Sequence, residues 1–130
     1  MNDSLATDIT TIAADFAKAI AAGDRSWLMS MLASNVEFRA LTPSRVWEID
    51  SAEDAVETML GTWFGGERHI DSVQSVEMDT VGDIVRVGYR FGATTPAGPA
   101  VVEQQAYLAL ADNTITAVRI VCSGYHPVAD

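Results

Sequence analysis

Two side chains in this sequence are candidates for proton transfer near neutral pH: the carboxylate of Glu103 and the imidazole of His69. A carboxylate that lies among aromatic rings loses hydration, which favours its protonated form and suits it to general acid or base catalysis. Imidazole is the side chain that titrates near neutral pH without any perturbation. The alternatives are an ionised, hydrated Glu103 at the open end of a strand and a surface His69 at the start of another.

Three further polar side chains could orient a bound molecule: Tyr89, Gln105 and Tyr107. The amide could bind a carbonyl or hydroxyl group, and each phenol could donate its hydroxyl hydrogen to a ligand. Each group could equally be satisfied within the protein, because buried tyrosines usually find a protein partner and an amide can bond a neighbouring strand.

The aromatic residues favour a binding site for a planar or polycyclic molecule. The chain has three tryptophans, and Trp47 and Trp63 are expected at the rim of a pocket. At helical spacing, Trp63 and Phe64 could also be ordinary core residues. The candidates for ligand binding are Phe16, Phe38, Trp47, Trp63, Phe64, Tyr89, Gln105, Tyr107 and Cys122.

Other site chemistry finds little support in the sequence. Cys122 and His126 have the spacing of a metal-binding pair, but two ligands on a strand end and a tail do not make a site. Cys122 has no predictable base beside it. The sequence contains no glycine-rich phosphate loop, nucleophile elbow or dinucleotide fingerprint, so neither a cofactor nor a metal is expected.

The N-terminal half has the pattern of three helices. Apolar residues at steps of three or four over 5–20 predict a first helix that Gly23 ends, and Asp24 can cap a short second helix. Residues 51–54 resemble a capping box. The apolar stripe of the third helix runs over 56–64 and is stopped by two glycines.

The rest of the chain has the pattern of strands. Short strands are predicted at 36–40 and 46–49. Runs rich in Val, Ile, Tyr and Phe, separated by turn-forming segments, then predict four antiparallel strands at 69–78, 84–93, 100–110 and 115–122. Helices followed by a meander indicate one α+β domain over residues 1–130.

Alternation along the strands predicts which side chains face inward. The inward set of the strand from Ile84 is Val85, Val87, Tyr89 and Phe91, with Arg86 and Arg90 outward. In the last strand Val118, Ile120 and Cys122 are expected inside and Arg119 outside. The tail 124–127 could fold back over the mouth of the interior.

Four stretches carry a resemblance to a known superfamily: Ala21-Ala22-Gly23-Asp24, Asn35-Val36-Glu37-Phe38, Ser51-Ala52-Glu53-Asp54-Ala55-Val56 and Ile115-Thr116-Ala117-Val118-Arg119. They resemble the nuclear transport factor 2-like superfamily, which contains the ketosteroid isomerases and the SnoaL-like polyketide cyclases. The resemblance implies a cystatin-like cone, with three N-terminal helices packed on a strongly curved, mainly antiparallel sheet. It also implies homodimers formed through the outer face of the sheet.

The resemblance bears on the strand 100–110, whose facing is ambiguous. Alternation alone would send the more apolar set inward, which consists of Val102, Ala106, Leu108 and Leu110. The resemblance instead sends Glu103, Gln105 and Tyr107 inward, and we expect this second arrangement. It would leave Val102, Leu108 and Leu110 on the outer face beside Arg86, Arg90 and Arg119, a surface suited to a homodimer interface.

The resemblance does not extend to the known catalytic sets. A ketosteroid isomerase uses an aspartate base and an oxyanion site made by a tyrosine and a protonated aspartate. By the matches above, these positions hold Phe16, Phe38 and about Gln105. Epoxide hydrolases of the superfamily need an Asp–Arg–Asp set in the pocket, and no interior arginine is expected here.

The overall charge bears on partners and location. Eighteen acidic and eight basic side chains give a net charge of −10. Such a surface repels phosphate backbones and anionic lipids, so neither a nucleic-acid nor a membrane partner is expected. The start Met1–Ser4 lacks signal-peptide features, and a lone cysteine fits a reducing compartment, so a cytoplasmic location is expected.

Three functions remain open from the sequence. The first is a SnoaL-like protein of unassigned activity that binds a hydrophobic or polycyclic molecule. The second is a cofactor-free isomerase, cyclase or dehydratase that uses Glu103 or His69 for proton transfer. The third is a non-catalytic dimeric scaffold. The fold alone cannot choose, because one architecture can host all three.

Overall fold

The structure of this protein is a computed structural model that describes residues 2–128 of the chain, with side chains from residue 9 onward. The helices are α1 (Asn2–Ala22), α2 (Arg25–Met31), α3 (Ala52–Val56) and the π-helix η1 (Glu57–Trp63). The strands are β1 (Leu32–Thr42), β2 (Arg45–Ile49), β3 (His69–Val81), β4 (Ile84–Thr95), β5 (Gly98–Ala111), β6 (Thr114–Cys122) and β7 (His126–Pro127).

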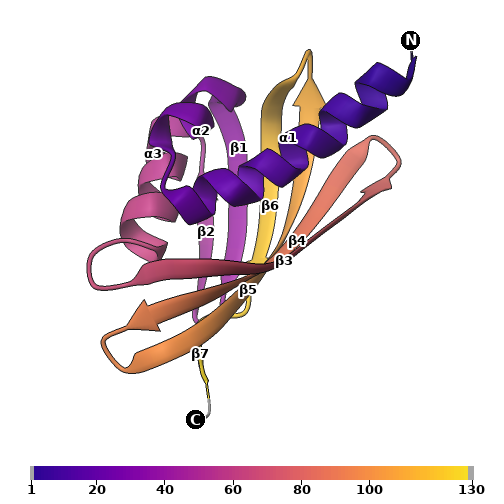
Figure 1. Cartoon of the computed structure of the whole chain (residues 1–130). Coiled ribbons are helices and arrows are strands. Elements are labelled where there is room, and N and C mark those ends of the chain that lie inside the picture. Colours follow the sequence, from indigo (N-terminus) through magenta and orange to yellow (C-terminus); the bar gives the residue numbers. More distant parts are fainter. Residues whose placement is uncertain (1, 129–130) are drawn as a thin grey trace.

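The strands form one strongly curved sheet, and the helices cover its concave side (Figure 1). The order of strands is β2-β1-β6-β5-β4-β3, with β7 added beside β5. The β1–β6 pairing is parallel and the other pairings are antiparallel. Helix α1 crosses the sheet, while α2 and α3 lie towards the β1 and β2 side (Figure 1). The α+β cone predicted from the sequence is confirmed.

Local sequence signals set the helix ends as expected. The Asp24 carboxylate accepts the backbone N–H of Trp27 at 3.0 Å, and the Ser51 hydroxyl accepts that of Asp54 at 3.2 Å. Each bond satisfies an N–H group that has no partner within its helix. Within residues 2–128, no helix is both long and apolar enough to cross a membrane.

The third helix differs from the prediction of one regular helix. After five residues of α3 the chain widens into the π-helix η1, and the N–H of Phe64 bonds back to the carbonyl of Met59 at 3.3 Å. A π-turn adds a residue to the turn and occurs frequently at functional sites. This one ends at Trp63, a side chain that the sequence pattern singled out for ligand binding.

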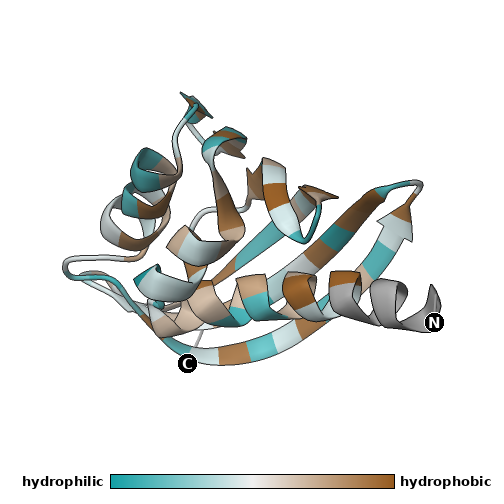
Figure 2. Ribbon diagram, turned by 90° about the horizontal axis from the view of Figure 1, so that it is seen from above, coloured by the Kyte–Doolittle hydropathy of each residue, from teal (hydrophilic) through white to brown (hydrophobic). Residues whose placement is uncertain are grey.

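The core lies between the helices and the concave face of the sheet. Hydrophobic and hydrophilic residues alternate along the strands (Figure 2), and one set is buried. The predicted facing of β4 is confirmed, because Val85, Val87, Tyr89 and Phe91 are buried and Arg90 is exposed. In β6, Val118 and Ile120 are buried and Cys122 is half-buried, while Arg119 is exposed.

The predicted facing of β5 is wrong. Val102, Gln104, Ala106 and Leu108 point inward and are at most 1% exposed. Glu103 and Tyr107 are exposed, and Gln105 lies beside them on the outer face.

The pairing with β4 explains this facing of β5. Phe91 is opposite Val102 and Val87 is opposite Ala106, so the apolar residues of the two strands share one face. Burying this set removes far more apolar surface from water than burying the alternate set would. The register taken from the resemblance was one residue off, which moves every side chain of a strand to the other face.

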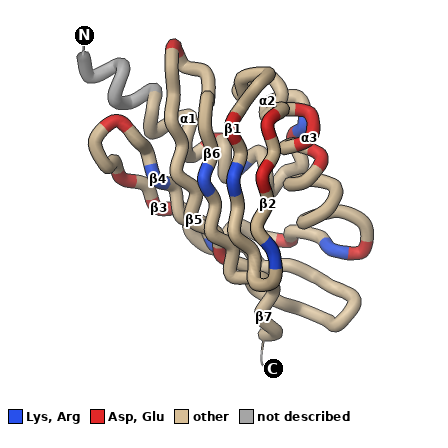
Figure 3. Tube along the Cα trace, turned by 180° about the vertical axis from the view of Figure 1, so that it is seen from behind, with Lys and Arg blue, Asp and Glu red and all other residues tan. Residues whose placement is uncertain are grey.

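The outer face of the sheet therefore differs from the expected apolar patch. Arg86, Arg90 and Arg119 lie there as predicted, but Val102 and Leu108 are in the core and Leu110 is half-buried. The basic positions of β1 and β6 are neighbours on this side (Figure 3). Homodimerisation through this face stays a prediction.

Candidate functional site

A hollow of about 310 Å³ opens at one end of the cone. It lies where the β1–β2 turn, the end of η1 and the segment after β6 come together. Its lining is mostly aromatic and small polar residues: Thr42, Pro43, Ser44, Trp47, Thr62, Trp63, Phe64, Arg68, Val102, Cys122, Gly124 and Tyr125. The volume is at the lower end of the range of small-molecule sites.

Trp47 and Trp63 form one side of this hollow. The Trp47 ring is held in place by its N–H, which donates to the Thr42 hydroxyl at 3.0 Å. It meets the Trp63 ring edge-on with centroids 5.9 Å apart. An edge-to-face pair of this kind is a favoured arrangement of aromatic rings. The end of the π-helix and the β1–β2 hairpin are thereby fixed against each other.

The aromatic cluster continues inward from these two tryptophans. Phe38 is 5.9 Å from Trp63, and Phe64 is 6.0 Å from Phe91, both measured between ring centroids. Tyr89 stacks on Phe91 at 5.0 Å. A molecule in the hollow would therefore contact a wall of rings that reaches into the core.

The C-terminal segment closes the hollow on another side. The hydroxyl of Tyr125 donates to the carbonyl of Trp63 at 2.6 Å, and its ring packs on Phe64. Burial of this hydroxyl raises the pKa of Tyr125 to about 12. Gly124 has a φ of 77° and lies against Pro43, where an added Cβ would be 2.7 Å from the proline Cγ. Of the tail 124–127 expected over the mouth, Gly124 and Tyr125 line the hollow, whereas His126 and Pro127 pair with β5.

Two buried donors beside the hollow lack an acceptor. The hydroxyl of Tyr89 donates to Oε1 of Gln104 at 2.6 Å, and burial holds the pKa of Tyr89 well above its usual value. Among the side chains that the structure describes, residues 9–128, the Nε2 of Gln104 and the Nε1 of Trp63 have no hydrogen-bond partner. Gln104 is paired across the sheet with Cys122, which lines the hollow, and Trp63 lines it directly.

The similarity of this chain to known proteins lies in its fold and not in its sequence. No family model and no curated protein matches the chain. A candidate isomerase from Bacillus subtilis is 10% identical with a TM-score of 0.74, over 90% of this chain and 87% of that one. A candidate polyketide cyclase from Xanthomonas campestris is 14% identical with a TM-score of 0.69, over 88% and 90%. A nuclear transport factor 2-like protein from Burkholderia xenovorans is 13% identical with a TM-score of 0.67, over 90% of each chain.

This chain has the nuclear transport factor 2-like fold. The likeness covers nearly the whole chain, and at these identities it concerns the fold alone. The resemblance drawn from the four sequence stretches is thus confirmed at the level of architecture. The chemistry has to be argued from the residues that this version of the fold places at its hollow.

The structure brings together part of the predicted ligand-binding set. Trp47, Trp63, Phe64 and Cys122 line the hollow. Behind it, Phe16, Phe38 and Tyr89 are at most 2% exposed and form the core of the nuclear transport factor 2-like fold. Gln105 and Tyr107 lie on the opposite face of the sheet, so the inward orientation predicted for them is wrong.

Neither candidate for proton transfer lies along the hollow. Glu103 points outward and forms an ion pair with Arg90 at 3.7 Å, so its predicted place inside the cone is wrong. The reason is the register of β5 described above. His69 begins β3 with an exposed side chain and does not line the hollow. A catalytic role inside the cone for either residue has no geometric support.

Sequence reasoning missed Gln104 and Arg68 as members of the site, and it included Tyr125 only as part of a tail that could fold over the mouth. The signal for Gln104 was available, because it is the polar residue within the alternating apolar set of β5. Arg68 and Tyr125 lie outside regular elements, where alternation gives no guidance. Only the packing of the tail against the end of η1 brings them together.

As far as the described side chains go, the lining offers oxygen, nitrogen and sulfur atoms but no carboxylate or imidazole. Within residues 2–128, no three His, Cys, Asp or Glu side chains are grouped so that they could hold a metal ion. The groups present can donate hydrogen bonds and pack against rings.

Proposed function

We propose that this protein binds a small ring-containing molecule with a hydrogen-bond acceptor, in the hollow lined by Trp47 and Trp63. The observation that carries the proposal is the pair of unpartnered donors, the Gln104 amide and the Trp63 indole, beside that hollow. An unsatisfied donor in the interior costs about 1–3 kcal/mol. Both donor atoms are fully buried, so a ligand carbonyl or ether oxygen would recover part of this cost once the side chains between them and the hollow shift on binding.

The Tyr89 hydroxyl supports the proposal because it orients the amide. Gln104 accepts the hydroxyl hydrogen through Oε1, which leaves its N–H₂ group to face another acceptor. The Tyr89 phenol stays neutral because burial raises its pKa, so it remains a donor to the amide. A fixed amide N–H in an aromatic surrounding is the kind of polar group that gives an apolar pocket its specificity.

Binding is better supported than catalysis. Proton transfer needs a group that titrates near the working pH within hydrogen-bond reach of the substrate. The lining contains no carboxylate or imidazole, and burial raises the pKa of Tyr125, a phenol that lines the hollow, to about 12. We therefore favour a binding protein over the cofactor-free isomerase, cyclase or dehydratase that Glu103 or His69 would serve.

The test is a binding screen with two matched glutamine variants. A panel of steroid, terpene and polyketide ketones is titrated into the protein, with tryptophan fluorescence and the thermal unfolding midpoint as readouts. Gln104→Leu should weaken binding of a ketone about tenfold, the loss expected for one buried hydrogen bond. Gln105→Leu, the neighbouring change on the outer face, should leave affinity unchanged.

Two outcomes would overturn the proposal. One is a panel in which no compound changes the fluorescence or raises the unfolding midpoint. The other is an equal loss of affinity in Gln104→Leu and Gln105→Leu, which would mean that the inner face of β5 does not take part in binding. Circular dichroism of both variants shows whether each retains the fold.

A further inference from the structure

The arginines of this protein divide into two groups. Lys18 is the one lysine among the eight basic residues, so the other seven are arginines. Within residues 9–128, five arginines form an ion pair with a carboxylate: Arg25 with Glu57, Arg39 with Asp50, Arg86 with Asp79, Arg90 with Glu103 and Arg119 with Glu37. Arg45 and Arg68 form none there, although the chain carries 18 acidic residues.

Arg68 lies at the hollow, whereas Arg45 lines a neighbouring groove on the other side of Trp47. The guanidinium carbon of Arg68 is 5.8 Å from the centre of the Tyr125 ring. The guanidinium of Arg45 lies over the Trp47 ring at 3.7 Å, and Trp47 also lines the hollow. Each arginine is thus supported by a ring that belongs to the mouth of the cone.

The charge of the hollow is opposite to that of the rest of the protein. Within residues 9–128, Arg68 is the single charged residue in its lining, while the whole chain carries a net charge of −10. A larger groove on the other side of Trp47, about 600 Å³, is lined by Glu48, Asp54 and Glu57 besides Arg45. The acidic side chains of this region therefore gather beside the groove and not around the hollow.

Stacked guanidinium groups are well suited to an anion. A guanidinium that lies over an aromatic ring keeps its N–H edge free, and that edge matches the two oxygens of a carboxylate. Both side chains are exposed, so they can reach a charged group that stays at the surface while the rest of a ligand is inside. An arginine without a carboxylate partner also has no ion pair to break before it binds one.

We propose that the ligand is a ring compound with a single anionic group, a carboxylate or sulfonate. The ring body enters the hollow between Trp63 and Tyr125, and the anionic group stays at the mouth, bound by Arg68 and attracted by Arg45. This inference rests on the proposed function and specifies its ligand class. Arg68 makes the larger contribution because it lines the hollow, whereas Arg45 acts from the far side of the Trp47 ring.

The test compares two fluorescent probes with the same rings. Anilinonaphthalene sulfonate carries one negative charge, and N-phenylnaphthylamine is its neutral counterpart. The wild type should bind the anionic probe about tenfold more tightly than the neutral one, and added salt should reduce this preference. Arg68→Gln should remove most of the preference and Arg45→Gln a smaller part, while affinity for the neutral probe stays unchanged.

Two further variants locate the effect. Arg90→Gln removes an exposed arginine on the outer face of the sheet and should leave both affinities unchanged. Thr62→Trp places a bulky ring at an exposed position of the lining and should reduce binding of both probes.

The outcomes separate this inference from the proposed function. Equal affinity for the two probes in the wild type, or equal loss in Arg68→Gln and Arg90→Gln, would overturn the anionic ligand class and leave ring binding intact. Binding of neither probe, or binding that Thr62→Trp does not change, would count against the hollow itself and thus against both.

Discussion

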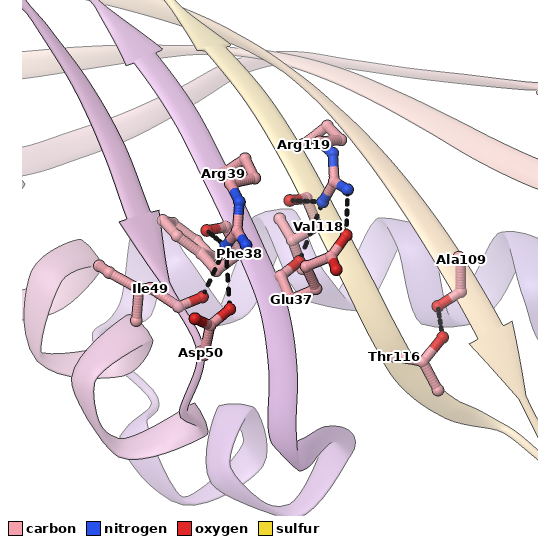
Figure 4. Close-up of polar contacts among 9 residues, drawn as sticks. All are labelled: Glu37, Phe38, Arg39, Ile49, Asp50, Ala109, Thr116, Val118 and Arg119. Carbon is pink, nitrogen blue, oxygen red and sulfur yellow. Dashed lines mark hydrogen bonds and ion pairs between the residues drawn. The ribbon is translucent and has the colours of Figure 1, made fainter.

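The polar side chains on the two faces of the curved sheet differ in whether they have a hydrogen-bond or ion-pair partner. On the outer face, Arg119 pairs with Glu37 across β6 and β1, and Arg39 pairs with Asp50 and with the carbonyl of Ile49 (Figure 4). On the inner face, Tyr89 and Gln104 bond each other. Among residues 9–128, the Gln104 N–H₂ group and the indole N–H of Trp63, which packs over this face from η1, find no partner.

The difference is the basis on which we propose that the inner side binds a ligand. An exposed polar group can always bond water, so its ion pairs add little stability and its lack of a partner costs little. A buried donor has no such recourse, and native proteins leave few of them unsatisfied. The inner face carries a cost that an acceptor on a bound molecule would relieve.

The largest expected effect is on stability, and it comes from comparing two substitutions on β1, one on each face of the sheet. Phe38→Ala should lower the free energy of unfolding by about 3–5 kcal/mol, because its ring is fully buried and a cavity would remain. Leu41→Ala, at a side chain that is 51% exposed on the other face, should change it by about 0.5 kcal/mol or less.

Urea denaturation followed by tryptophan fluorescence measures both values. A Leu41→Ala loss that grows with protein concentration would contradict an open outer face, because it would mean that a second copy covers it. That result would support the homodimer that the resemblance implies.

A smaller effect is expected from the polar pair of the inner face. Tyr89→Phe should lower the free energy of unfolding by about 1–3 kcal/mol, because it leaves Oε1 of Gln104 without its partner. Gln104→Leu should lower it by less, because it also removes the unpartnered N–H₂ group. The double variant should lose clearly less than the sum, since it removes both polar groups. Additive losses in this double-mutant cycle would show that the two side chains do not act as a pair.

The smallest effect is expected on the outer face. Arg119→Gln should cost about 0–1 kcal/mol, because Arg119 and Glu37 are each about half exposed. The difference from the wild type should shrink at high salt, where exposed ion pairs are screened. If Arg119→Gln lowered the free energy of unfolding as much as Tyr89→Phe, with no dependence on salt, the polar contacts of the two faces would not differ in strength as we expect.

Much of the fold was accessible from the sequence because its signals are local. The caps at Asp24 and Ser51 act on backbone groups three residues away, so their residue types were sufficient to predict them. The facing of β4 followed from a clean alternation of apolar residues with arginines. For β5, the same rule was correct, and the alignment preferred over it was wrong by one residue.

The candidate site was only partly predictable because its members come from separate elements. Trp47, Trp63 and Phe64 were recognised from their type, but nothing local places Arg68 and Tyr125 beside them. The π-helix also has no sequence signal of its own, since its residues would suit a regular helix equally well.

The amino-acid sequence by itself determined the α+β class, the helix caps and the apolar face of each strand, because these depend on residue type and on spacing within one element. Only the tertiary structure decided that, within residues 9–128, Gln104 and Trp63 are left with free donors, and that Arg68 at the hollow and Arg45 beyond Trp47 have no carboxylate partner there. Whether a polar group has a partner depends on segments far apart in the chain, and that becomes defined only when the sheet curves and the tail closes over it.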